Sequence, residues 1–130
     1  MPKEMIVPDP DRKPPGFAPA TKAGNLVFVS GQTGTGERGT VEGGMREQTQ
    51  QTFKNLETVL QAAGATMDDV TKITCFLLHE NDYKVYAEER LKAFVADAQP
   101  ASSTVIVKAL ARPEFLVEIE AIGVIGAGED

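Results

Sequence analysis

The sequence predicts an α+β fold in which two helices pack on one face of a β-sheet. Three observations support this prediction. Several short runs are rich in β-branched and aliphatic residues, as strands are. Two longer stretches repeat apolar residues at three- and four-residue spacing, as amphipathic helices do. The elements follow in the order β-β-β-α-β-α-β-β without an internal repeat or a linker, so we expect one domain over residues 1–130.

The first third of the chain is expected to contain three strands. They are predicted at residues 3–7, 20–22 and 26–30. Residues 8–19 hold five of the eight prolines and should be extended or looped. Gly24-Asn25 is typical of a tight hairpin turn. The third strand ends at Gly31-Gln32, where a ligand or another chain can approach the backbone closely.

Residues 34–39 match the pattern GxGxxG and follow a strand. A dinucleotide site requires a helix that begins at the third glycine. Residues 40–44 intervene before any helical pattern starts, so we interpret this segment as a flexible surface loop.

The two helices are predicted at residues 45–63 and from Asn81-Asp82 to about Ala98. Gly64 is a natural stop for the first helix, and Thr66 with Asp69 has the pattern of a capped turn. A strand at residues 70–78 separates the helices. The second helix carries an apolar stripe formed by Tyr83, Tyr86, Leu91, Phe94 and Val95.

The last two strands are predicted at residues 100–107 and 116–122, and the connection between them is short enough for a hairpin-like return. In the final strand Val117 and Ile119 point to one face, whereas Glu118 and Glu120 point to the other. Carboxylates on a face shared with apolar residues indicate a cleft or an interface. A solvated sheet face is the alternative.

Two helices can cover only one face of such a sheet. The strands at 70–78 and 103–110 nevertheless carry apolar residues on both faces. Self-association is the simplest way to bury the second face, so the pattern predicts a homo-oligomer.

Composition excludes several classes of function. The net charge is −6 and the 13 basic residues are scattered, which argues against nucleic-acid binding. No run approaches the ~20 apolar residues of a membrane span. The single Cys75 fits a reducing cytoplasm, and the single His79 leaves no convincing ligand set for a metal.

Eight segments of the chain, spread over residues 17–124, resemble the RidA (YjgF) family. They are residues 24–32, 48–49, 55–56, 63–64, 68–70, 81–83, 100–105 and 117–121. The resemblance implies a single RidA-like domain with a chorismate-mutase-like subunit and a mixed β-sheet. It also implies a homotrimer with small-molecule clefts between neighbouring subunits. Members similar to RidA hydrolyse reactive enamines and imines, such as 2-aminoacrylate, to 2-keto acids and ammonia without a metal or organic cofactor.

The resemblance also implies roles for individual residues. Glu118 aligns with the acid that orients the attacking water, and Ser30 with the Gly31 backbone lines the substrate site. Ser102 stands where the family has the arginine that binds the substrate carboxylate. Thr104 stands at a position often occupied by cysteine, and its backbone would help to polarise the substrate.

Two further positions depart from the family pattern. Phe17 replaces a tyrosine of the cleft and lacks its hydroxyl, and Ala87 replaces an asparagine of the second helix. Arg90 and Arg112 could replace the missing cation, but we interpret each as an exposed surface charge. Cys75 is interpreted as a core residue.

These residues leave two hypotheses open. The first is a RidA-like hydrolase or deaminase that acts on a small reactive enamine, imine or related compound, with its substrate preference altered at Ser102. A substrate without a carboxylate, or a different hydrolysis, would fit the retained Glu118 and the missing arginine. The second is a non-catalytic trimer that binds a small ligand or has a regulatory role. An RNA-cleaving role is disfavoured by the negative charge.

Overall fold

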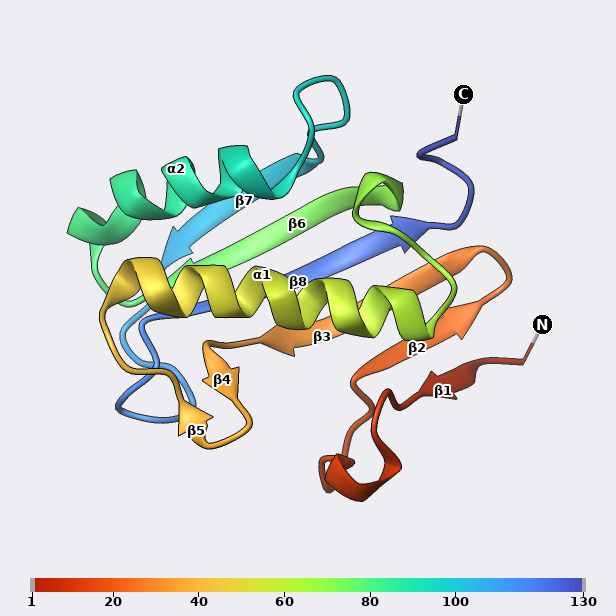
Figure 1. Ribbon diagram of the computed structural model, residues 1–130, viewed down its shortest axis with the longest axis horizontal. Helices are drawn as coiled ribbons and strands as arrows, with labels where there is room; N and C mark the ends of the chain where they lie inside the picture. Colours follow the sequence, from red (N-terminus) through yellow and green to blue (C-terminus); the bar gives the residue numbers. More distant parts are fainter. Residues whose placement is uncertain (1, 130) are drawn as a thin grey trace.

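The computed structural model describes residues 2–129 and places both helices on the same face of a six-stranded sheet (Figure 1). The order in this sheet is β1-β2-β3-β8-β6-β7. Its strands are β1 (Glu4–Ile6), β2 (Ala20–Ala23), β3 (Leu26–Gln32), β6 (Val70–Leu77), β7 (Ala101–Ile106) and β8 (Val117–Val124). Only β6 and β7 pair in parallel, and the other neighbours are antiparallel. The predicted mixed sheet with two helices on one face is confirmed.

Helix α1 (Met45–Ala62) begins and ends close to the predicted positions. The Gly44 N–H, just before the helix, donates a hydrogen bond of 2.8 Å to the side chain of Glu47. After the helix Gly64 has φ +84°, a conformation that glycine adopts without a steric cost. The predicted capped turn forms the short helix η2 (Met67–Asp69), in which the Thr66 N–H donates to Asp69.

The predicted hairpin between the last two strands is wrong. β8 does not pair with β7 but lies between β3 and β6, antiparallel to both. Its inward side chains Val117, Ile119 and Ala121 are at most 3% exposed, so the strand with the most regular apolar alternation takes the centre of the sheet. β7 begins with exposed small residues and lies at the sheet edge.

Helix α2 (Tyr83–Ala93) is shorter than predicted, and its buried residues are Tyr86, from the predicted stripe, and Glu89, from outside it. It begins after the short helix η3 (Glu80–Asp82). At Phe94 the backbone becomes extended, and the ring of this residue packs edge-on against Phe53 at 5.8 Å. Leu91 and Val95 are exposed, so the predicted apolar stripe is only partly correct.

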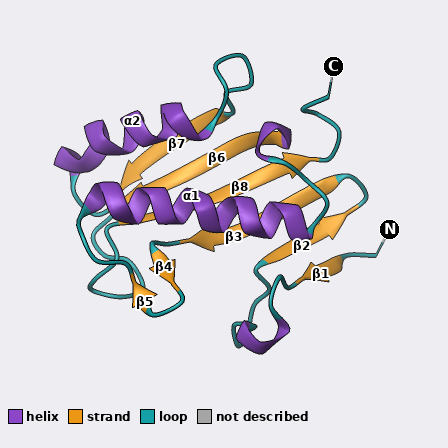
Figure 2. Ribbon diagram, in the orientation of Figure 1, coloured by secondary structure: helices purple, strands orange, loops and turns teal. Residues whose placement is uncertain are grey.

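Two segments predicted as loops contain short regular elements (Figure 2). The segment at residues 34–39 was predicted as a flexible loop. Instead, β4 (Thr35–Gly36) and β5 (Gly39–Thr40) pair there as a two-stranded hairpin. The proline-rich segment contains the short helix η1 (Pro10–Arg12). Among residues 2–129 no helix has the length and apolar character needed to cross a lipid bilayer.

The core lies between the helices and the facing side of the sheet, and the opposite face of the sheet is open. The open face carries large apolar side chains, among which Leu26, Phe28 and Val105 are each more than 40% exposed. Strand alternation and register place Glu118 and Glu120 on this same face, beside Phe76 and Thr74 of β6. The predicted division of β8 into an apolar and an acidic face is confirmed.

Candidate functional site

The side chain of Glu118 lies against the backbone of Gly31. Glu118 belongs to β8, and Gly31 lies on the neighbouring β3 where the pairing shifts register between Val29 and Gln32. A β-carbon at position 31 would collide with the Glu118 carboxylate, so only glycine leaves room for it. The structure therefore brings together two of the site residues predicted from the sequence.

Ser30 fixes the segment that carries Phe17. The Ser30 hydroxyl donates a hydrogen bond of 2.6 Å to the carbonyl of Ala18. Its N–H donates to the carbonyl of Pro19 at 2.9 Å. These two bonds hold the end of the proline-rich segment beside β3, and Phe17 projects from it with 57% of its surface exposed.

Phe17 and Gly31 line a cleft of about 530 Å³ between the proline-rich segment, the β4–β5 hairpin and α1. Its charged side chains have both signs and include Arg12 and Lys54. Glu118 does not line this cleft. Gly31 therefore lines this cleft together with Phe17 and also contacts Glu118. Phe17 and Glu118 themselves do not share one pocket in the single chain.

Glu118 is half-buried, and its protonation is altered by its surroundings. Burial raises the pKa of the Glu118 carboxyl above its usual range, and the negative charge of Glu120 on the same face adds to the rise. A carboxyl group with a raised pKa can both accept and donate a proton closer to neutral pH than an exposed glutamate can.

Ser102 and Thr104 lie on the other face of the sheet from Glu118. Ser102 pairs with Ile73, whose side chain is in the core, whereas Glu118 pairs with Phe76 on the open face. β7 is also two strands away from β8, a separation of about 10 Å. One chain therefore does not bring Ser102 and Thr104 together with Glu118.

Arg90 reaches Ser102 from α2. Its guanidinium donates hydrogen bonds of 3.4 Å to the Ser102 hydroxyl and to the Tyr83 hydroxyl. The guanidinium carbon lies 5.1 Å from the ring centre of Tyr86 and 5.8 Å from that of Tyr83. The interpretation of Arg90 as an exposed surface charge is wrong, because the residue is half-buried and its head group packs on two aromatic rings and reaches two hydroxyls. Arg112 is exposed, as expected.

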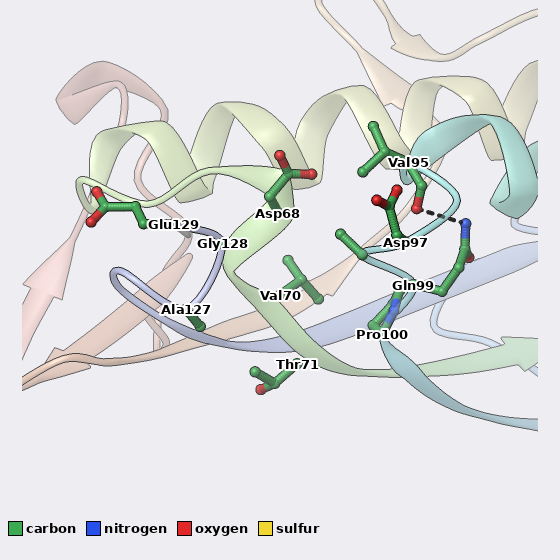
Figure 3. A pocket seen from close by; sticks show the side chains of 11 residues that line it. Asp68, Val70, Thr71, Val95, Asp97, Gln99, Pro100, Ala127, Gly128 and Glu129 are labelled. Atoms are coloured by element: carbon green, nitrogen blue, oxygen red, sulfur yellow. Dashed lines mark hydrogen bonds between the residues drawn. The ribbon is translucent and has the colours of Figure 1, made fainter.

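A second cleft, of about 550 Å³, lies where β6 and β7 begin and the C-terminal segment passes them (Figure 3). Its charged side chains are all acidic and belong to Asp68, Asp97 and Glu129. None of the site residues predicted from the sequence lines it. This cleft is not the candidate site.

A family model described as Endoribonuclease L-PSP matches residues 12–125. The chain belongs to this family. A RutC family protein of Pyrococcus horikoshii is 38% identical over 129 residues, which cover 92% of this chain and 96% of that protein. A protein of Dermatophagoides farinae named 2-iminobutanoate/2-iminopropanoate deaminase is 38% identical over 127 residues, or 95% and 98% of the two chains.

Solved structures agree with this assignment. A crystal structure from Yersinia pestis is described as a protein of unknown function of the conserved Rid family, YyfA. It superposes with a TM-score of 0.88 at 31% identity and covers 95% of this chain and 100% of its own. Membership of the RidA (YjgF) family, predicted from the sequence motifs, is confirmed.

In this L-PSP family chain, two residues that depart from the family pattern lie near the same arginine. They are Ala87 on α2 and Ser102 on β7, and the arginine is Arg90. Ala87 is four residues after Tyr83 and three before Arg90, so all three share one side of α2. Arg90 in turn contacts Ser102. Sequence analysis missed the role of Tyr83 and Tyr86 around Arg90. The signal in the sequence is the spacing of three and four residues between Tyr83, Tyr86 and Arg90, which places them on one side of a helix.

Beneath Arg90 the L-PSP family chain buries two weakly acidic groups. Burial raises the pKa of the Cys75 thiol to about 12 and that of the Tyr86 phenol to about 12. Both groups are therefore neutral at physiological pH, and Cys75 is a core residue and not an activated nucleophile. The Tyr86 hydroxyl is fully enclosed and makes no hydrogen bond of acceptable geometry within the described chain.

Residues 2–129 contain no group of three or more histidine, cysteine or acidic side chains placed to hold a metal ion. Glu118, the backbone of Gly31 and the neighbouring hydroxyls are the groups that the candidate site offers for chemistry.

Proposed function

We propose that this chain is a RidA-like deaminase, a hydrolase that converts a small reactive enamine or imine to a carbonyl compound and ammonia. The observation that carries the proposal is the half-buried Glu118 carboxylate over the Gly31 backbone. The 38% identity to a protein named as a 2-iminobutanoate/2-iminopropanoate deaminase supports the same reaction class.

In the proposed reaction, ionised Glu118 accepts a proton from water while the water oxygen attacks the imine carbon. Glu118 passes that proton to the nitrogen as the C=N bond becomes a single bond, so a neutral carbinolamine forms and Glu118 is ionised again. Glu118 then accepts the proton of the carbinolamine hydroxyl and transfers it to the amine nitrogen. The C–N bond breaks, and ammonia leaves as the C=O bond forms. An enamine enters the same route after a proton adds to its carbon and another leaves its nitrogen, which converts it to an imine. The backbone near Gly31 and Thr104 would polarise the substrate.

We further propose a homotrimer of single-domain, chorismate-mutase-like subunits that span residues 1–130. Its ligand clefts would lie between neighbouring subunits. The placement of Ser102 and Thr104 on the opposite face from Glu118 supports this assembly, because residues from two subunits could then line one cleft. The apolar open face supports it as well, since a second copy would cover Phe28 and Val105. A cytoplasmic location, expected from the single Cys75, remains a prediction.

The experiment follows keto-acid release from freshly generated 2-iminobutanoate. We expect the wild-type protein to accelerate this reaction and Glu118→Gln to lower the rate by about 10²–10⁴-fold, because glutamine cannot accept the proton. Glu120→Gln is the matched control, since Glu120 is an exposed carboxylate two residues along the same strand face. It should retain most of the activity.

A wild-type protein that does not accelerate imine hydrolysis would refute the deaminase. The non-catalytic ligand-binding trimer would then be the better account of the fold. Equal losses in Glu118→Gln and Glu120→Gln would instead refute the specific role of Glu118.

A further inference from the structure

Arg90, which lies between α2 and β7, differs from Arg46, which links α1 to α2, in having no acidic partner. Arg46 forms ion pairs with Glu88 at 2.8 Å and with Glu89 at 2.5 Å, and Lys92 also reaches Glu89. Among residues 2–129 no carboxylate forms an ion pair with Arg90. A partly buried guanidinium without a counter-charge has a high affinity for an anion.

The head group of Arg90 is also held in one orientation. It lies over the rings of Tyr83 and Tyr86 and donates to the hydroxyls of Tyr83 and Ser102. Both hydrogen bonds are long, at 3.4 Å, so donors of the guanidinium remain for a ligand. A side chain fixed in this way loses less conformational entropy when it binds an anion.

The hydroxyl groups around Arg90 keep protons that they could donate. Tyr83 and Ser102 accept hydrogen bonds from Arg90, so their own protons are available to a second acceptor. Beneath them, the buried Tyr86 hydroxyl has no partner in the described chain. The exposed part of the cluster therefore presents a positive charge together with two neutral donors, Tyr83 and Ser102, and no ion-paired carboxylate.

We propose that Arg90 binds the carboxylate of the substrate, with Ser102 and Tyr83 as neutral hydrogen-bond donors beside it. This inference rests on the proposed function and narrows it to an imine or enamine that carries a carboxylate next to the reacting carbon. The cation comes from α2, whereas the family resemblance places it on β7, at the position of Ser102. The substitution at Ser102 has relocated the charge and not removed it.

The test compares the wild-type protein with Arg90→Gln on two readouts. The first is kcat/KM for 2-iminobutanoate and for its uncharged amide. The second is the affinity for 2-oxobutanoate, measured by calorimetry without catalysis. We expect Arg90→Gln to lower kcat/KM for the acid and the affinity for 2-oxobutanoate by about 10–100-fold each. Its kcat/KM for the amide should barely change.

Two further variants control for net charge and for damage to the fold. Arg112→Gln removes the same charge from an exposed position and should behave like the wild-type protein. The double variant Arg90→Gln/Ser102→Arg restores a cation to the neighbouring strand. We expect it to recover most of the lost affinity for 2-oxobutanoate.

The two readouts separate this inference from the proposed function. Imine hydrolysis that persists with an unchanged kcat/KM in Arg90→Gln would overturn the role of Arg90 and leave the deaminase standing. A wild-type protein that binds 2-oxobutanoate through Arg90 without hydrolysing the imine would support the anion site and overturn the deaminase. If the wild-type protein neither binds 2-oxobutanoate nor hydrolyses the imine, both proposals fail.

Discussion

At the scale of single residues, ionisation of Glu118 lowers the stability of the folded chain. Its pKa is raised because burial and the nearby Glu120 disfavour the ionised form. In the unfolded chain the glutamate is neither buried nor held beside Glu120, so it ionises near the ordinary pKa of about 4.3. The folded state therefore binds the Glu118 proton more tightly, and its stability falls as the pH rises through the folded-state pKa.

This linkage predicts that Glu118→Gln stabilises the protein at pH 7. The stabilisation should shrink as the pH falls toward 4, where the wild-type carboxyl is largely protonated in both states. Melting temperatures of both proteins between pH 4 and pH 7 measure the difference. Glu57→Gln, at an exposed position of α1, controls for the loss of one negative charge. A stabilisation that does not depend on pH would contradict the prediction.

At the scale of elements, α1 positions the strand that carries Glu118. The buried side chain of Gln48 donates a hydrogen bond of 2.9 Å to the carbonyl of Glu114. Its oxygen accepts one of 2.9 Å from the N–H of Leu116. The amide of Gln48 thus satisfies both backbone groups of the connection just before β8 begins at Val117. The position of β8 relative to α1 depends on this pair of bonds.

Gln48→Ala should destabilise the protein by about 1–3 kcal/mol, because it removes two part-buried hydrogen bonds to the backbone. Chemical denaturation measures the free energy of unfolding. Gln61→Ala, an exposed position on the same helix, should be nearly neutral. The proposed deaminase activity should fall more in Gln48→Ala than in Gln61→Ala, since the start of β8 moves. Equal stabilities of the two variants would argue against a stabilising role for the two hydrogen bonds of Gln48.

The elements differ in how well the sequence predicts them. α1 was predictable because its apolar period is regular and Gly64 stops it. The order of β7 and β8 was not, because alternation shows which face a side chain occupies but not which strand lies beside it. The contact of Arg90 with Ser102 was also beyond the sequence, since α2 and β7 meet only in the folded chain. Glu118 and Gly31 were predicted through the family motif, and the structure brings them together.

At the scale of the whole molecule, the open face of the sheet exposes large apolar side chains that a single chain does not cover. Its apolar side chains flank the carboxylates of β8, so water would contact both in an isolated subunit. Contiguous apolar surface of this kind is unusual for a monomer. The proposed trimer would cover it and raise the local burial of Glu118.

Phe28→Glu should therefore dissociate the proposed trimer, because it places a charge at the centre of the open face. Light scattering measures the mass, which should be three times that of one chain in the wild-type protein and lower in the variant. Leu91→Glu is the control, since Leu91 is 68% exposed on α2 and away from the open face. A wild-type protein with the mass of a single chain would contradict the prediction.

The central place of β8 also has a consequence for synthesis on the ribosome. Of the six strands in this sheet, the last to be translated is the one that joins β3 to β6. Until it emerges, the nascent chain holds two separate sheet fragments, each with an unpaired edge of the kind that promotes aggregation. The Gly128 N–H then donates to Asp69 at 2.9 Å and ties the segment after β8 to the turn before β6. The six-stranded sheet can therefore close only after β8 has left the exit tunnel.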